Sequence, residues 1–417
     1  MRIAVVGLGY MGLPMAAVLA RAGHQVVGID IRPAAVAAVN AGQADFSEPG
    51  LNDLVASAHA SGRLRAVLGG AALPQNLEKG WAEAYVLSLP TPVDHVTHTA
   101  DMGAVRAGVQ SLIPLLQGGE LIVLESTSPL GATETDVRQV IEAARPELGG
   151  NIDYVFCPER AIPGNTLHEM VHNDRLVGGL TEAATARGVA LYQSFCQGTV
   201  LACSAGEAEL VKLVENASRD VQIAFANELS LVCQTLGLNV RRIIELANRH
   251  PRVNILQPAA GVGGHCIAVD PWFIVQAAPA LTPLLQTARR VNDAKPQWVA
   301  QQVLAAAKAT GQAKPVVAAL GLAYKPDVDD LRESPSIAVV EALAKAGLEL
   351  RVVEPHLSTW TMPLTPLEQA VREADVVVTL TAHSAFKRLP EGALAGKPVV
   401  DAVGLFAGRA DALRVVM

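Results

Sequence analysis

The sequence lacks the cysteine patterns that mark disulfide-rich and zinc-binding proteins. Its five cysteines show neither CxxC nor Cys/His spacing and are scattered along the chain at Cys157, Cys196, Cys203, Cys233 and Cys266. Scattered cysteines of this kind are typical of reduced thiols in a cytosolic protein. We therefore expect a cytoplasmic protein that binds no metal.

Long runs of apolar or basic residues are also missing. No apolar run reaches the roughly 20 residues of a membrane-spanning helix, and no signal peptide precedes the first strand-like segment. The formal net charge is −7, and no basic run offers a surface for nonspecific binding to nucleic acid. We expect neither a membrane nor a nucleic acid as a partner.

The first segment has the pattern of a dinucleotide-binding site. A GxGxxG motif stands between a strand-like segment, residues 2–6, and a helical pattern, residues 13–22. Its glycines allow a tight turn, close approach of a pyrophosphate and close packing of helix on strand. A second strand, residues 25–29, leads to an acid that would hold ribose hydroxyls and repel a 2′-phosphate, which favours NAD over NADP. The predicted NAD-binding residues are Gly7, Gly9, Tyr10, Met11, Gly12, Asp30 and Arg32.

Three further strands are predicted in this half, over residues 84–89, 121–124 and 153–156. Ligands of open parallel sheets lie beyond the carboxyl ends of the strands. Thr91 and Thr127 follow two of these ends, and either face the cofactor or cap the following helices. Glu159, next to Arg160, follows the third end and is a further candidate for the crevice.

One long helix is predicted over residues 207–236, which contain neither proline nor glycine and carry apolar residues at helical spacing. About 30 residues at 1.5 Å each give a length of about 45 Å. We predict a homodimer through this helix. Lys212 and Asn216 lie four residues apart and share one face. They are either site residues, or an exposed lysine and an asparagine with local bonds.

The second half repeats the strand pattern of the first. A strand over residues 316–320 leads into Gly321, and the spacing from Gly347 to Glu354 equals that from Gly23 to Asp30. The charged loop that follows contains Lys325 and Arg332, which suit phosphate oxygens unless the loop is solvated and internally paired. We predict an α/β protein with two Rossmann-like lobes, each with a parallel sheet, joined by a long central helix and a helical middle domain. The expected domains are 1–200, 201–305 and 306–417.

A glycine-rich loop in the middle of the chain carries one cysteine. Gly261, Gly263 and Gly264 precede Cys266, and Asp270 follows four residues later. Glycines let a ligand come close to the backbone, and a deprotonated thiol is a covalent nucleophile. The alternative is a turn followed by a small, inert hydrophobe.

Taken in order, these motifs resemble the UDP-sugar 6-dehydrogenase family, the UDP-glucose and UDP-N-acetylhexosamine dehydrogenases. The resemblance covers nearly the whole chain and is carried by GLGYMGLP at 7–14, PTP at 90–92, EST at 125–127, CPER at 157–160, AELVK…N at 208–216, GVGGHCIAVDPWF at 261–273 and GLAYKPDVDDLRESPS at 321–336. GHCIAVDPWFIV, with NRHPRVNI at 248–255, is most similar to the branch that acts on UDP-N-acetyl-D-mannosamine. Ala259-Ala260 departs from the Gly-Pro found in similar members.

The resemblance implies roles for individual residues. Cys266 would be the nucleophile, assisted by Asp270 and Lys212, while Asn216 would orient water or substrate. Glu159 would serve the hydrolytic step, and Thr127 would lie between the cofactor and the reacting carbon. Arg332 is assigned to the cofactor. The residues assigned to the UDP-sugar are Glu159, Arg160, Lys212, Asn216, Gly263, Tyr324 and Lys325, with Arg249, His250 and Arg252 as candidates to reach it from a neighbouring subunit.

The activity implied is an NAD-dependent, four-electron oxidation of the C6 hydroxyl of UDP-N-acetyl-D-mannosamine to a carboxylate, through a thiohemiacetal and a thioester on Cys266. UDP-N-acetylglucosamine and UDP-glucose are alternative substrates. A single-step hydroxy-acid dehydrogenase also has an N-terminal Rossmann lobe and a Lys…Asn helix, but it has no use for Cys266 or for the last segment. A catalytically silent nucleotide-binding regulator would need neither Cys266 nor Lys212.

Overall fold

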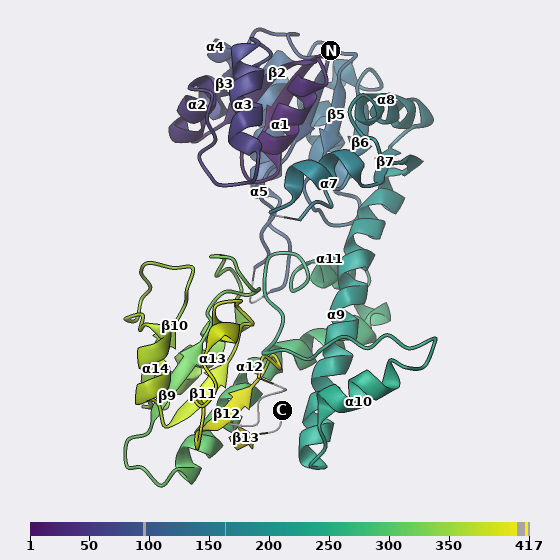
Figure 1. Ribbon diagram of the computed structural model, residues 1–417. Coiled ribbons are helices and arrows are strands. Elements are labelled where there is room, and N and C mark those ends of the chain that lie inside the picture. Colours follow the sequence, from purple (N-terminus) through teal and green to yellow (C-terminus); the bar gives the residue numbers. More distant parts are fainter. Residues whose placement is uncertain (95–96, 163, 407–412, 416–417) are drawn as a thin grey trace. The chain divides into compact units, whose positions relative to one another are not determined.

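The computed structural model describes residues 1–417 except 95–96, 163, 407–412 and 416–417. The chain divides into two compact units, Met1–Val214 and Glu215–Met417, and each is described by itself. Both units combine helices with a mainly parallel sheet (Figure 1), which confirms the predicted α/β fold class.

An eight-stranded sheet forms the centre of the first unit, in the order β3-β2-β1-β4-β5-β6-β7-β8. Neighbouring strands are parallel except β6 and β7, which are antiparallel. The order of the first six strands is that of a doubly wound dinucleotide-binding lobe. The strands are β1 (Arg2–Val6), β2 (Gln25–Asp30), β3 (Leu64–Leu68), β4 (Ala84–Leu87), β5 (Leu121–Leu124), β6 (Asp153–Phe156), β7 (Arg175–Gly179) and β8 (Val200–Ser204).

Helices cover both faces of this sheet because its inner strands are apolar on both sides. In β1, Ile3 and Val5 enter one core, whereas Ala4 and Val6 enter the other. The helices are α1 (Gly12–Arg21), α2 (Pro33–Asn40), α3 (Leu51–Ala60), α4 (Leu73–Asn76), α5 (Gly103–Leu112), α6 (Gln139–Ala144), α7 (Thr166–His172) and α8 (Glu182–Gln193). Shorter helical turns are η1 (Gly70–Ala72), η2 (Ile113–Leu115), η3 (Thr133–Arg138) and η4 (Pro146–Leu148).

Helix α9 (Ala205–Thr235) is 31 residues long and confirms the long helix predicted from the sequence. The division between the two units falls inside it, after Val214. Gly237 follows its end with a φ of +69°, the left-handed conformation that commonly terminates a helix.

The second unit contains a five-stranded sheet in the order β10-β9-β11-β12-β13, with all neighbours parallel. Its strands are β9 (Val316–Leu320), β10 (Glu349–Val353), β11 (Val376–Thr379), β12 (Pro398–Asp401) and β13 (Leu413–Val415). Its helices are α10 (Val240–Ala247), α11 (Asp270–Ala277), α12 (Pro283–Ala309), α13 (Pro335–Lys345) and α14 (Leu367–Glu373), with short turns η5 (Pro279–Leu281) and η6 (Phe386–Arg388).

The two sheets repeat the same strand-end geometry. Leu8 N donates to Asp30 Oδ2 over 2.8 Å in the first unit, and Leu322 N donates to Glu354 Oε2 over 2.8 Å in the second. The glycine before each donor has a positive φ, +92° at Gly7 and +98° at Gly321. The predicted echo between the two halves is therefore present in the backbone and not only in the strand pattern.

Several elements were not predicted from the sequence, among them β3, β7, β8 and α12. Helix α12 contains Pro296, which lacks the N–H that an α-helix interior uses. Its buried face, which includes Val299 and Val303, holds the helix against the sheet of the second unit. Within the described residues, no helix combines the length and apolarity needed to span a membrane.

Candidate active site

The glycine loop after β1 is built for close backbone contacts. A Cβ added to Gly7 would lie 2.1 Å from the carbonyl oxygen of Ser88, and one added to Gly12 would lie 1.9 Å from that of Gly7. Around a Cβ on Gly9, by contrast, no atom of the described residues lies within 4 Å. The first and third glycines therefore close the turn, while the second leaves open backbone that a pyrophosphate can approach.

Asp30 is fixed at the end of β2. Its side chain is buried and accepts hydrogen bonds from Leu8 N and Arg32 N, each over 2.8 Å. An ionised carboxylate has about four acceptor positions, so it keeps capacity for ribose hydroxyls. The Arg32 side chain pairs with Asp30 at 3.4 Å and with Asp45 at 2.7 Å. NAD thus fits the residues of this loop, with Asp30 already oriented.

The other residues assigned to the cofactor have different surroundings. Tyr10 is 52% exposed and its ring lies 4.5 Å from that of Phe46, whereas Met11 packs against the core. Thr91 Oγ1 donates to the carbonyl oxygen of Thr127 over 2.6 Å. This bond ties together the segments after β4 and β5. Neither threonine caps the helical segments that follow, because the N-cap residues of α5 and η3 are Met102 and Ala132.

Glu159 lies in a buried charged cluster after β6. Its Oε1 accepts hydrogen bonds from Arg160 N and Ala161 N, each over 2.7 Å, and its Oε2 pairs with Arg175 Nη2 at 3.0 Å. Burial works against its charge, but the Arg175 charge and these hydrogen bonds outweigh it and lower the pKa of Glu159. The Arg160 guanidinium instead donates to the carbonyl oxygen of Asp174.

Glu125, Arg175 and Tyr192 belong to the same cluster and were not predicted as site residues. Burial and the nearby charge of Glu159 raise the pKa of Glu125 to about 7. Tyr192 Oη donates to Glu125 Oε1 over 2.6 Å, and the Arg175 guanidinium lies 5.3 Å from the centre of the Tyr192 ring. The position of Glu125 at the carboxyl end of β5 is the one sequence signal that could have identified it.

In the second unit, the glycine loop before Cys266 packs against the segment that follows β9. A Cβ on Gly263 would lie 2.6 Å from the carbonyl oxygen of Glu333 and 2.7 Å from the Cβ of Tyr324. Gly264 N donates to the carbonyl oxygen of Arg332 over 3.1 Å. The Cys266 side chain is exposed, so the alternative of an inert buried thiol does not hold.

Cys266 leads directly into α11, which begins with Asp270. Asp270 N donates to the carbonyl oxygen of Cys266 over 2.8 Å, and the carboxylate of Asp270 is buried. Asn216 Nδ2 donates to Asp270 Oδ2 over 2.5 Å, so the asparagine bond is not local. Lys212 lies one turn before Asn216 on α9 and is 9% exposed, so it is not the exposed lysine of the alternative interpretation.

The remaining candidates lie on loops of the second unit. Tyr324 and Lys325 are half-buried, and Arg332 pairs with Asp330 through two bonds of 2.8 and 2.6 Å. The charged loop is thus internally paired at Arg332. Arg249, His250 and Arg252 are exposed in the segment that follows α10.

Comparison with known proteins places these features in one family. Three models of the UDP-glucose/GDP-mannose dehydrogenase family match the chain: the NAD-binding domain over residues 1–196, the central domain over 206–294 and the UDP-binding domain over 318–407. The GxGxxG loop lies in the first of these matches, the Cys266 loop in the second and the loop with Lys325 in the third.

Characterised relatives match over nearly their whole length. The chain is 44% identical to the NDP-N-acetyl-D-galactosaminuronic acid dehydrogenase of Ralstonia nicotianae, covering 98% of this chain and 96% of the relative. It is also 44% identical to the UDP-N-acetyl-D-mannosamine dehydrogenase of Salmonella typhi, covering 97% and 99%. A solved UDP-D-ManNAc dehydrogenase from Pyrococcus horikoshii superposes with a TM-score of 0.90 at 34% identity, covering 99% and 98%.

The glycine loop with its oriented acid, the exposed thiol before the Asn216–Asp270 hydrogen bond and the second Rossmann-like lobe thus follow one another along the chain in the order of the family's three domains. The chain belongs to the UDP-glucose/GDP-mannose dehydrogenase family and is an NAD-dependent oxidoreductase.

Proposed function

We propose that this protein oxidises the C6 hydroxyl of UDP-N-acetyl-D-mannosamine to a carboxylate through covalent intermediates on Cys266. The observation that carries the proposal is the exposed Cys266, held by glycines and followed within one turn by Asp270, which Asn216 holds in place. Relatives that are named for this substrate and are 44% identical to this chain support the choice of sugar.

When bound, NAD accepts one hydride from C6 in each of two oxidations, so that the alcohol, two NAD⁺ and one water give the carboxylate, two NADH and three protons. Between the two oxidations, the Cys266 thiolate adds to the C6 aldehyde and forms a thiohemiacetal. The second oxidation converts this adduct into a thioester. Water then cleaves the carbon–sulfur bond, which releases the carboxylate and returns the thiol.

Each polar residue has a role that suits its surroundings. Asp270 accepts and returns protons, and Asn216 fixes its orientation. Lys212 stabilises the alkoxide, a preorganised electrostatic contribution worth about 3–4 kcal/mol in comparable sites. Glu159 is the base that directs water onto the thioester, since Arg175 lowers its pKa and keeps it ionised. Thr127 lies beside the cofactor at the carboxyl edge of the sheet.

The remaining residues hold the two nucleotides. Gly7, Gly9, Tyr10, Met11, Gly12, Asp30, Arg32, Thr91 and Arg332 contact NAD. Arg160, Gly263, Tyr324 and Lys325 contact the UDP-sugar, and Arg249, His250 or Arg252 reaches it from a second subunit. We assign these functions to an NAD-binding domain over 1–200, a central domain over 201–305 and a UDP-sugar-binding domain over 306–417.

We further propose a homodimer through α9. Five apolar side chains of α9 and its C-terminal end are more than a third exposed: Leu210, Val214, Phe225, Val232 and Leu236. At 3.6 residues per turn they lie within about 80° of one another around the helix. An apolar stripe this continuous is covered most simply by a second copy. The free thiols fit a cytoplasmic location.

The experiment is to measure NADH formed per sugar consumed with four substrates: UDP-N-acetyl-D-mannosamine, UDP-N-acetyl-D-glucosamine, UDP-N-acetyl-D-galactosamine and UDP-glucose. The proposal predicts two NADH per molecule and the highest kcat/KM with the mannosamine sugar. The galactosamine sugar is included because of the Ralstonia relative.

One NADH per sugar would support a single-step dehydrogenase and contradict the covalent route. Two NADH with a higher kcat/KM for another sugar would leave the chemistry intact and overturn only the choice of substrate.

A further inference from the structure

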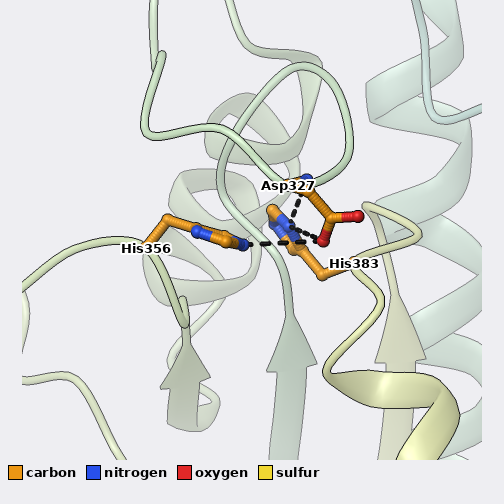
Figure 2. Close-up of side chains that lie close together, drawn as sticks. All are labelled: Asp327, His356 and His383. Atoms are coloured by element: carbon orange, nitrogen blue, oxygen red, sulfur yellow. Dashed lines mark hydrogen bonds and ion pairs between the residues drawn. The ribbon is translucent and has the colours of Figure 1, made fainter. Parts of the chain in front are cut away.

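We propose that Asp327, His356 and His383 form a binding site for a divalent transition-metal ion, of which Zn²⁺ is the representative. The three residues follow three neighbouring parallel strands of the second unit, β9, β10 and β11. Figure 2 shows both imidazole rings directed toward the Asp327 carboxylate. The ligands are far apart in the sequence, which is why no spacing motif revealed them.

The distances between the three groups suit a single ion. His356 Nε2 lies 3.6 Å from Asp327 Oδ1, and His383 Nδ1 lies 3.8 Å from the same oxygen. All three candidate ligand atoms lie within 4.8 Å of one another. In a tetrahedral site with zinc–ligand bonds of about 2.0–2.1 Å, ligand atoms are about 3.4 Å apart. The two measured edges would contract by a few tenths of an ångström, and the half-exposed His356 ring would turn to bring the two imidazole nitrogens to the same spacing.

His383 is prepared for this role by a buried carboxylate behind it. Its side chain is fully buried, and its Nε2 lies 3.1 Å from Oε2 of the equally buried Glu354. Asp327 N donates to Nδ1 over 2.9 Å, so Nδ1 bears a lone pair and Nε2 carries the proton. A histidine that donates its other N–H to a carboxylate is the usual arrangement behind a metal-binding imidazole, because the carboxylate fixes the tautomer and the ring orientation.

Glu354 occupies the strand-end position that the ribose-binding acid has in the first lobe, but its side chain has a different partner. Its counterpart in the first unit, Asp30, accepts bonds from Leu8 N and Arg32 N, and its one side-chain partner among the described residues is Arg32. Glu354 accepts bonds from Leu322 N and Ala323 N and has the buried His383 as its side-chain partner. Glu354 therefore orients the His383 ring.

The donor set selects the class of metal. Two imidazoles and one carboxylate suit divalent transition metals such as zinc, iron, nickel or copper, whereas magnesium and calcium prefer oxygen ligands alone. The side chains of His356 and Asp327 are 34% and 45% exposed, so an ion can enter from solvent and keep water in a further position. Binding replaces the hydrogen bond from Asp327 N to His383, and it would fix the loop after β9 to the ends of β10 and β11.

The test is calorimetric titration of the metal-stripped full-length protein with Zn²⁺, with Cys266→Ala as the background of all samples so that the exposed thiol does not contribute. His356→Ala should weaken binding of one zinc equivalent at least tenfold, since even loss of an outer hydrogen-bond partner costs about 10–100-fold. Asp327→Asn should weaken it in the same direction. Both altered side chains are exposed, so the fold should persist.

The matched control is His172→Ala. His172 stacks on His168 with ring centres 4.1 Å apart, which makes it an exposed histidine pair on the surface of the first unit. Zinc binding in this variant should equal that of the background protein, and excess Mg²⁺ should not compete. Unchanged zinc binding in His356→Ala, or no zinc binding by the background protein, would overturn the proposal. None of these readouts depends on catalytic activity.

Discussion

At the scale of single residues, the carboxylates of the candidate site differ in how their charge is compensated. Asp270 accepts a bond from Asn216, and Glu159 pairs with Arg175 and accepts two backbone N–H bonds. Glu125 has only the Tyr192 hydroxyl on Oε1, and its Oε2 is buried with no hydrogen-bond partner among the described residues. The fold therefore keeps Glu159 charged and favours the neutral form of Glu125.

This difference predicts a pH dependence of stability. Because the pKa of Glu125 is raised to about 7, the folded protein holds a proton there that the unfolded chain has already released. Stability from this group is complete at low pH and is lost as the pH rises toward 7. Glutamine does not titrate, so this loss is absent in Glu125→Gln. The free energy of unfolding of the variant minus that of the wild type should therefore be about 2 kcal/mol larger at about pH 8.5 than at about pH 5.5, at 1.36 kcal/mol per pKa unit.

The measurement is the free energy of unfolding in urea for both proteins at the two pH values. If the free energies of unfolding of variant and wild type differed by the same amount at both pH values, Glu125 would already be ionised in the folded state.

At the scale of elements, α9 and α12 are joined by buried polar groups. Arg289 on α12 pairs with Asp220 on α9 at 2.6 Å, and Asn292 Nδ2 donates to the same Asp220 oxygen over 2.7 Å. The side chains of Arg289 and Asp220 are 2% and 1% exposed. These buried polar and charged contacts thus hold the two helices in a specific register.

Removing one partner should be costly. Asp220→Ala leaves the buried Arg289 charge with the half-exposed Asp293 as its remaining carboxylate partner, and it should lower the free energy of unfolding by about 3 kcal/mol, the low end of the cost of breaking a buried pair. The control is Glu245→Ala, which breaks an exposed pair with Arg242 and should cost less than about 1 kcal/mol. Urea denaturation measures both, and equal losses in the two variants would contradict the role given to the buried pair.

The elements also show how far the sequence alone leads. The glycine motif, the strand ends and the proline-free α9 carry strong local signals, so the lobes and most candidate residues could be predicted. Helix α12 could not, because Pro296 argues locally against a helix that is held by tertiary packing. The partners Arg175 and Tyr192 could not either, because β7 and α8 bring them to Glu125 and Glu159 from distant sequence.

At the scale of the whole molecule, α9 exposes a stripe of apolar side chains that a second copy of the chain would cover. Phe225 is 53% exposed near its middle. Phe225→Glu would place a charge in the proposed dimer interface and should shift the protein toward monomer. Arg219→Glu also introduces a glutamate, but at a position about 120° around the helix from Phe225, and it should leave the dimer intact. Sedimentation velocity distinguishes them; a wild-type monomer, or a Phe225→Glu dimer as stable as the wild type, would refute the interface.

The central claim is that Cys266 carries the sugar through the second oxidation. The most direct measurement is uronate formation from UDP-N-acetyl-D-mannosamine and NAD by Cys266→Ser, with Cys196→Ser as a matched thiol control and calorimetry to verify sugar-nucleotide binding. The account predicts no uronate from Cys266→Ser, with binding retained, and normal formation by the control. Uronate formation by Cys266→Ser at the wild-type rate would contradict it.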